Sequence, residues 1–142
     1  MQSLYESYGI IWEKSKRDVC SFLHTCMKFN PDKEPYEYLQ NRWKSLKEML
    51  DSSPESIDIG VSDAIKYYES LCKETLPEDK VKQLKLIQYR SKAEDFQTNF
   101  GIVLKARKEA IPEEVYSLLE NAVKNEAKRF VAEKAEAMGV AL

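Results

Sequence analysis

A chain of 142 residues has the length of one domain, and with 43% hydrophobic residues it can bury a core without disulfides. Lys and Arg number 22 against 24 Asp and Glu, so the formal net charge of −2 excludes a global attraction to nucleic acid or to an acidic membrane. One His, four Gly and three Cys leave little material for metal, nucleophilic or phosphate-binding sites.

The cysteines and the N-terminal residues indicate the compartment. Cys20, Cys26 and Cys72 are odd in number and lack CxxC spacing, which favours reduced thiols. Residues 1–12 lack the pattern of a secretory signal, and no stretch approaches the roughly 18 uncharged apolar residues of a membrane span. We therefore expect a soluble cytoplasmic protein that uses no membrane contact and no cofactor.

The first two predicted helices precede residue 51. Over residues 4–29 the apolar side chains share an arc about 120° wide, which predicts one long amphipathic helix that ends at Asn30-Pro31. A second helix begins between Pro31 and Pro35 and ends near Leu50. Its apolar stripe consists of Tyr36, Leu39, Trp43, Leu46 and Leu50.

Residues 51–60 are rich in Ser, Asp, Pro and Gly, and they predict a loop with at most one helical turn. A third helix follows from about Ser62 to Lys73, and Thr75 to Glu78 fit a capping box that starts the next helix. The third helix is expected to bury Val61, Ala64, Ile65, Tyr68, Leu71 and Cys72.

A fourth predicted helix spans residues 78–110 and has two apolar faces. Leu84 and Ile87 lie on one face with Val81, whereas the face of Phe96 and Phe100 is rotated by more than a quarter turn. The helix either contacts two neighbours or bends between residues 86 and 91. Pro112 then breaks or kinks the chain before a fifth helix, whose stripe runs from Val115 to Phe130.

These segments predict an all-α fold, with residues 1–142 forming a single domain. The expected architecture is an elongated helical bundle of about five helices. The first, fourth and fifth would be long rods, and the second and third would lie end to end as a two-helix layer.

Metal and triad chemistry are excluded by the few candidate ligands. Cys20 and His24 share a side of the first helix, but Cys26 points about 120° or more away from both, so the three cannot converge on one ion. The single His also cannot supply a di-iron bundle, and no Gly-rich turn presents a nucleophile. We expect no metal site and no catalytic residue of these kinds.

Two carboxylates in the last helix leave an enzymatic alternative open. Glu126 and Glu133 both fall at the margin of the apolar arc, where an unpaired charge is costly. They could act as an acid–base pair or bind a cation, which would make the protein a carboxylate-based enzyme. Alternatively, they form salt bridges with Lys or Arg of a neighbouring helix.

A basic segment, Lys80–Lys92, contains no acidic residue. Lys82, Lys85 and Lys92 could form a phosphate-contacting strip beside Tyr89, as in a nucleic-acid-associated protein. A solvated helix face has the same sequence pattern.

Partner-binding residues are predicted from a second stripe. Tyr38, Arg42 and Met49 share a side of the second helix that its main stripe does not use, and Tyr67 lies at the shoulder of the third. Tyr, Arg and Met are enriched in protein interfaces, although a thicker core would explain the stripe equally well.

We therefore predict a protein-binding helical bundle, which acts as an inhibitor, adaptor or regulatory module and either binds another protein or forms a homodimer. Its partner surface is expected on the second helix and on the first half of the fourth, where Lys82, Lys85 and Tyr89 lie. Nucleic-acid association through Lys80–Lys92 and carboxylate-based catalysis are the alternatives.

Overall fold

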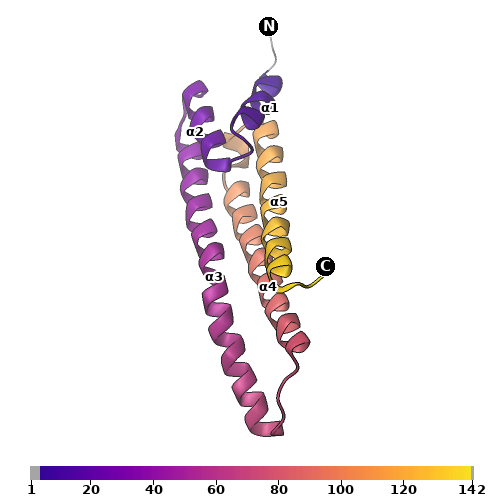
Figure 1. Cartoon of the computed structure of the whole chain (residues 1–142). Helices are drawn as coiled ribbons and strands as arrows, with labels where there is room; N and C mark the ends of the chain where they lie inside the picture. Colours follow the sequence, from indigo (N-terminus) through magenta and orange to yellow (C-terminus); the bar gives the residue numbers. More distant parts are fainter. Residues whose placement is uncertain (1–3, 142) are drawn as a thin grey trace.

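The computed structural model describes the backbone of residues 4–141 and the side chains of residues 8–141. Within these residues the chain is all-α, as predicted, and contains no strand (Figure 1). The helices are α1 (Leu4–Lys14), α2 (Val19–Phe29), α3 (Glu34–Cys72), α4 (Glu78–Lys105), the short 3-10 helix η1 (Lys108–Ala110) and α5 (Glu113–Met138).

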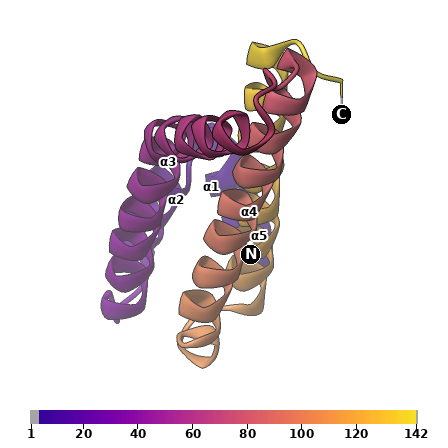
Figure 2. The ribbon, with the colours of Figure 1, turned by 90° about the horizontal axis from the view of Figure 1, so that it is seen from below.

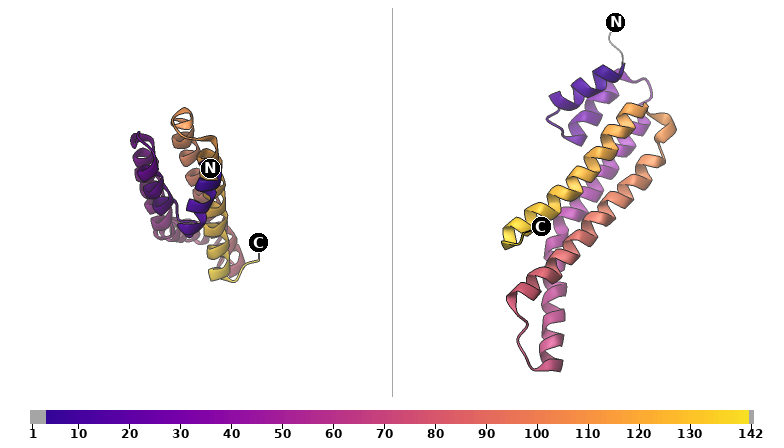
Figure 3. Two further views of the ribbon diagram at one scale, coloured as in Figure 1. Left: turned by 90° about the horizontal axis from the view of Figure 1, so that it is seen from above. Right: turned by 90° about the vertical axis from the view of Figure 1, so that its right-hand side faces the viewer.

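Three long rods, α3, α4 and α5, run in alternating directions along the molecule (Figure 1). Helix α4 packs against both α3 and α5, while α2 lies along the first half of α3 and α1 joins the end of the bundle near α5 (Figures 2 and 3). The end of α3 and the start of α4 project beyond the C-terminus of α5. The long rods are thus α3, α4 and α5, and the first predicted helix is not among them.

The predicted helix over residues 4–29 is wrong, because the chain reverses between Lys14 and Val19. Lys16 and Arg17 adopt left-handed conformations with φ of 57° and 58°. Asp18 then starts α2, and its carboxylate accepts a hydrogen bond from the backbone N–H of Ser21 at 3.0 Å. An N-cap of this kind satisfies an orphan donor and favours a new helix start.

The predicted loop over residues 51–60 is also wrong, since α3 continues through it as one helix of 39 residues. Pro54 lacks the N–H that would normally bond to the carbonyl of Leu50. The hydroxyl of Ser53 donates a hydrogen bond to that carbonyl oxygen at 2.6 Å, and the Ser53 side chain is buried. Ile57 and Val61 continue the buried stripe, so packing stabilises the helix on both sides of the proline.

The remaining boundaries differ less from those predicted. Helix α4 begins at Glu78, as predicted, but its N-cap is Pro77 with no side-chain hydrogen bond, so the capping box does not form. The same helix ends at Lys105 rather than near residue 110, and η1 follows. Pro112 is the N-cap of α5, so it breaks the chain into two helices.

The core lies where α3, α4 and α5 meet. Trp43 packs edge-on against Phe96 and Phe100, with ring centroids 5.2 and 5.1 Å apart. Towards the end of α5, Tyr89 makes a similar contact with Phe130 at 6.0 Å. None of the helices within residues 4–141 has the length and apolar character needed to cross a membrane.

Candidate protein-binding face

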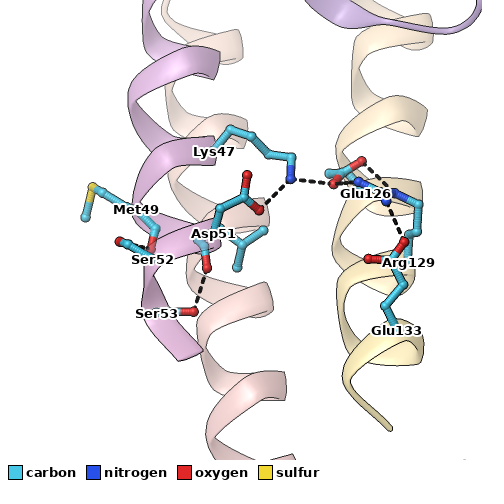
Figure 4. Close-up of polar contacts among 9 residues, drawn as sticks. Lys47, Met49, Asp51, Ser52, Ser53, Glu126, Arg129 and Glu133 are labelled. Carbon is cyan, nitrogen blue, oxygen red and sulfur yellow. Dashed lines mark hydrogen bonds and ion pairs between the residues drawn. The ribbon is translucent and has the colours of Figure 1, made fainter. Parts of the chain in front are cut away.

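The pair formed by α3 and α4 is covered on one side only. Lys47 and Asp51 of α3 point toward α5, where Lys47 Nζ lies 2.9 Å from Glu126, whereas Met49 points the other way (Figure 4). Helix α2 contacts the covered side as well, since the side chain of Gln40 donates a hydrogen bond to the α2 backbone. We call the opposite side of the α3–α4 pair the open face.

A groove follows the seam between α3 and α4 on the open face. It consists of three adjoining pockets of about 110, 360 and 500 Å³, and successive pockets share Lys92 and Leu84 as lining residues. Gly60 and Ala64 line its middle, and a Cβ on Gly60 would meet no atom within 4 Å. The groove therefore has room for side chains that the chain itself does not supply.

Large apolar side chains are exposed along this groove. Met49 lines the smallest of the three pockets and is 66% exposed. Tyr67 is 69% exposed and lies about five turns further along α3, on the same side of the helix as Met49. Ile102 lies about five turns from Leu84 on α4 by the same geometry. Seven of the ten exposed large hydrophobic residues of the described chain belong to the open face: Met49, Tyr67, Tyr68, Leu71, Leu84, Ile87 and Ile102.

The third predicted helix was expected to bury its stripe, and this prediction is wrong near the end of α3. Leu71 is 65% exposed, and Cys72 and Ala64 are exposed too. Ala64 and Leu71 lie on the open face, which no described helix covers, and α5 ends before the last turns of α3, so that end has only the start of α4 beside it (Figure 1). Val61 is buried, as expected, because it lies closer to the bundle.

The two apolar faces predicted for α4 are both present, and they have different surroundings. Ala93, Phe96 and Phe100 are buried in the core. Leu84 and Ile87 face the groove instead and remain exposed. One face of α4 thus packs within the core, whereas on the other face only Val81 packs against the core, and Leu84 and Ile87 stay exposed beside the groove.

Four predicted partner-binding residues come from one helix. By helical geometry, Tyr38, Arg42, Met49 and Tyr67 fall on one side of α3, and the continuity of α3 through Pro54 aligns Tyr67 with the other three. Arg42, Met49 and Tyr67 are exposed. The sequence pattern thus identified side chains of the open face, although it placed them on two separate helices.

Tyr38 has a neighbour that the sequence did not reveal. The guanidinium of Arg107 lies 3.9 Å from the centre of the Tyr38 ring, and that of Arg42 lies 5.6 Å from it. Arg107 also donates to Glu34, 2.7 Å away, which raises the pKa of Arg107. Arg107 follows the end of α4, and no periodic pattern links that position to Tyr38.

The predicted contribution of Tyr89 to a partner surface is wrong, because Tyr89 is 6% exposed and belongs to the core. Burial raises the pKa of Tyr89, and the nearby carboxylate of Asp58 raises it further. Lys85 lies 3.2 Å from Asp58, and Lys82 lies 3.6 Å from Glu78. These two lysines are half-buried and paired, so they do not form an exposed phosphate-contacting strip with Tyr89.

The two carboxylates of α5 are held in an ion-pair cluster (Figure 4). Arg129 donates to both Glu126 and Glu133, the latter at 2.6 Å, and Lys47 bridges Glu126 and Asp51. Burial alone would raise the pKa of Glu126, but the hydrogen bonds from Arg129 and Lys47 outweigh it and lower that pKa. Glu126 thus has the predicted salt bridge to a neighbouring helix, through Lys47 of α3, whereas Glu133 pairs with Arg129 of its own helix.

The metal-capable residues lie apart. Cys26 is buried, and burial raises its pKa to about 12, whereas His24 is exposed and Cys20 is half-buried. Within residues 8–141 no three side chains of His, Cys, Asp or Glu are grouped as metal ligands would be.

The open face has to be interpreted from its own chemistry. The sequence matches no protein-family model and no curated protein, and the structure matches no solved structure.

Proposed function

We propose that this chain is a protein-binding module without catalytic activity, and that it contacts its partner through the open face of the α3–α4 pair. The observation that carries the proposal is the set of seven exposed apolar side chains on the open face, of which Met49, Tyr68, Leu84 and Ile87 line the groove. Their exposed fractions leave on the order of 800 Å² of apolar surface, at roughly 200 Å² for each large side chain.

The chemistry of the groove favours a protein over a nucleic acid. Phosphate binding needs free basic side chains, and two of the three lysines of the predicted strip, Lys82 and Lys85, already contact acidic neighbours. Tyr and Met side chains at the rim of an apolar groove are typical of protein interfaces. The role would be that of an inhibitor, adaptor or regulatory module, and we place it in the cytoplasm, where its three unpaired thiols would stay reduced.

The test compares the proteins that bind to the immobilised wild-type chain with those that bind to two surface variants. The groove variant combines Met49→Asp with Ile87→Asp, and the matched control is Ile59→Asp, because Ile59 is 61% exposed but does not line the groove. We expect wild type and control to retain the same protein in high salt and the groove variant to lose it. Equal capture by all three chains would contradict the proposal, and capture of nucleic acid that disappears with added salt would favour the alternative.

A further inference from the structure

We infer that the partner on the open face is a second copy of this chain, docked by a two-fold axis that runs along the α3–α4 pair. This inference rests on the proposed function, because it names the occupant of the same face. A two-fold interface uses one patch twice, so the patch has to be complementary to itself. Three observations indicate that the open face meets this requirement.

The first observation is the charge of the two helices near the projecting end. Residues 55–73, the second half of α3 and its C-cap, carry four acidic and two basic residues, a net charge of −2. Residues 78–92 of α4 carry five basic and two acidic residues, a net charge of +3. An acidic helix and a basic helix thus lie side by side. A two-fold axis parallel to them places α3 of each copy beside α4 of the other, so that helices of opposite net charge become neighbours across the axis.

The second observation is the register of the two helices. The ion pair between Asp58 and Lys85 shows which residues of α3 and α4 lie at the same level. The helices are antiparallel, so the projecting end is reached by moving forward along α3 and backward along α4. Five residues from the ion pair in each direction, Asp63 of α3 lies level with Lys80 of α4. Both are exposed, and within residues 8–141 neither takes part in an ion pair. An axis along the helices keeps this level and brings Asp63 of one copy close to Lys80 of the other.

The third observation is the area. On the order of 800 Å² of exposed apolar surface per copy corresponds to the area that one partner buries in a standard stable interface. Two α3–α4 pairs joined through their grooves form a four-helix arrangement in which each helix has an antiparallel neighbour on two sides. Such an arrangement covers Leu84 and Ile87, the apolar face of α4 that the single chain leaves exposed.

The experiment is sedimentation velocity at low salt over a wide range of protein concentrations. We expect wild type and Ile59→Asp to form dimers and Ile87→Asp to remain monomeric, although the two isoleucines are exposed to a similar extent. Asp63→Lys alone and Lys80→Glu alone should each weaken dimerisation by about tenfold, because each creates two like-charge contacts across the axis. Mixing the two charge variants should restore dimers, since the introduced lysine then meets the introduced glutamate in one contact and Asp63 meets Lys80 in the other.

Several outcomes would overturn this inference. A wild-type chain that sediments as a monomer at every concentration contradicts it, as does a dimer that neither charge variant weakens. Circular dichroism of each variant shows whether it is folded, so loss of the dimer is not confused with loss of the fold. If wild type is monomeric but the groove variant still loses a captured protein, only the self-association fails. If the groove variant changes neither capture nor sedimentation, the proposed function fails too.

Discussion

Replacing Ser53 with Ala should destabilise the protein far more than an ordinary Ser→Ala change in a helix. Pro54 provides no N–H for the carbonyl of Leu50, and the Ser53 hydroxyl donates to that carbonyl oxygen at 2.6 Å from a buried position. Without the hydroxyl, a buried carbonyl lacks its donor, which costs about 1–3 kcal/mol of unfolding free energy. For a chain of this size we expect the melting temperature to fall by roughly 2–4 °C for each kcal/mol.

Replacing Pro54 with Ala should act in the opposite direction. Proline inside a helix is about 3 kcal/mol less favourable than Ala, and part of this is offset because Pro restricts the unfolded chain. We therefore expect Pro54→Ala to stabilise the protein by about 1–2 kcal/mol. The backbone N–H of the introduced alanine can then bond to the carbonyl of Leu50, so adding Ser53→Ala should cost less than about 0.5 kcal/mol in this background.

Urea unfolding of the four chains of this double-mutant cycle, at one protein concentration, measures the coupling between Ser53 and Pro54. Ser52→Ala is the matched control: its hydroxyl donates to the carbonyl of Met49 at 3.1 Å, but Ser52 is exposed. We expect that control to change stability by at most about 0.5 kcal/mol. If Ser53→Ala costs the same in the wild-type chain and in the Pro54→Ala background, the compensation described here is refuted.

Three further predictions concern the core and the ion-pair cluster. In the folded protein the pKa of Glu126 is lowered from 4.5 by its ion pairs with Arg129 and Lys47. These ion pairs stabilise the fold above pH 4.5, and that stability is lost as the pH falls through the lowered pKa. Acidification should therefore reduce the unfolding free energy of the wild-type chain more than that of Glu126→Gln. Trp43→Ala, which empties the contact between α3 and α4, should cost about 3–5 kcal/mol in urea unfolding. A thiol reagent at pH 8 should modify exposed Cys72 rapidly and buried Cys26, with a pKa of about 12, only after unfolding; equal rates would contradict the burial.

Helical periodicity predicted the fold class and much of the core. Residues such as Trp43 and Phe100 recur at helical spacing, and both are buried where α3 meets α4. Periodicity does not identify which neighbour covers a stripe. The stripe at the end of α3 is as regular as the one around Trp43, but Leu71 stays exposed because it lies on the open face, which no described helix covers.

The breaks between helices were the hardest feature to predict. Lys16 and Arg17 reverse the chain although neither is a helix breaker, and only the capping carboxylate of Asp18 signals the new start. At Pro54 the helix continues, although a proline within a polar stretch normally indicates a loop. The helix can continue because another donor replaces the missing N–H of the proline. That donor is the neighbouring Ser53, a residue type that also occurs in loops.

The sequence pattern indicated some of the exposed side chains of the open face, and its placement of Tyr89 was wrong for a physical reason. Tyr89 stands between basic residues in the sequence, which suggested an exposed strip, but it is four residues before Ala93 and shares its face. That face is buried against α5, with the Tyr89 ring on Phe130. Helical spacing was therefore a better guide to Tyr89 than the charges beside it.

The length of the groove depends on the continuity of α3. Met49 and Tyr67 lie on one line of the helix only because the turns between them, including Pro54, remain helical. A break at the proline would free the two halves to rotate independently, and the exposed side chains would no longer form one row. The Ser53 hydroxyl that satisfies Leu50 therefore also helps to keep Met49 and Tyr67 on one line of α3.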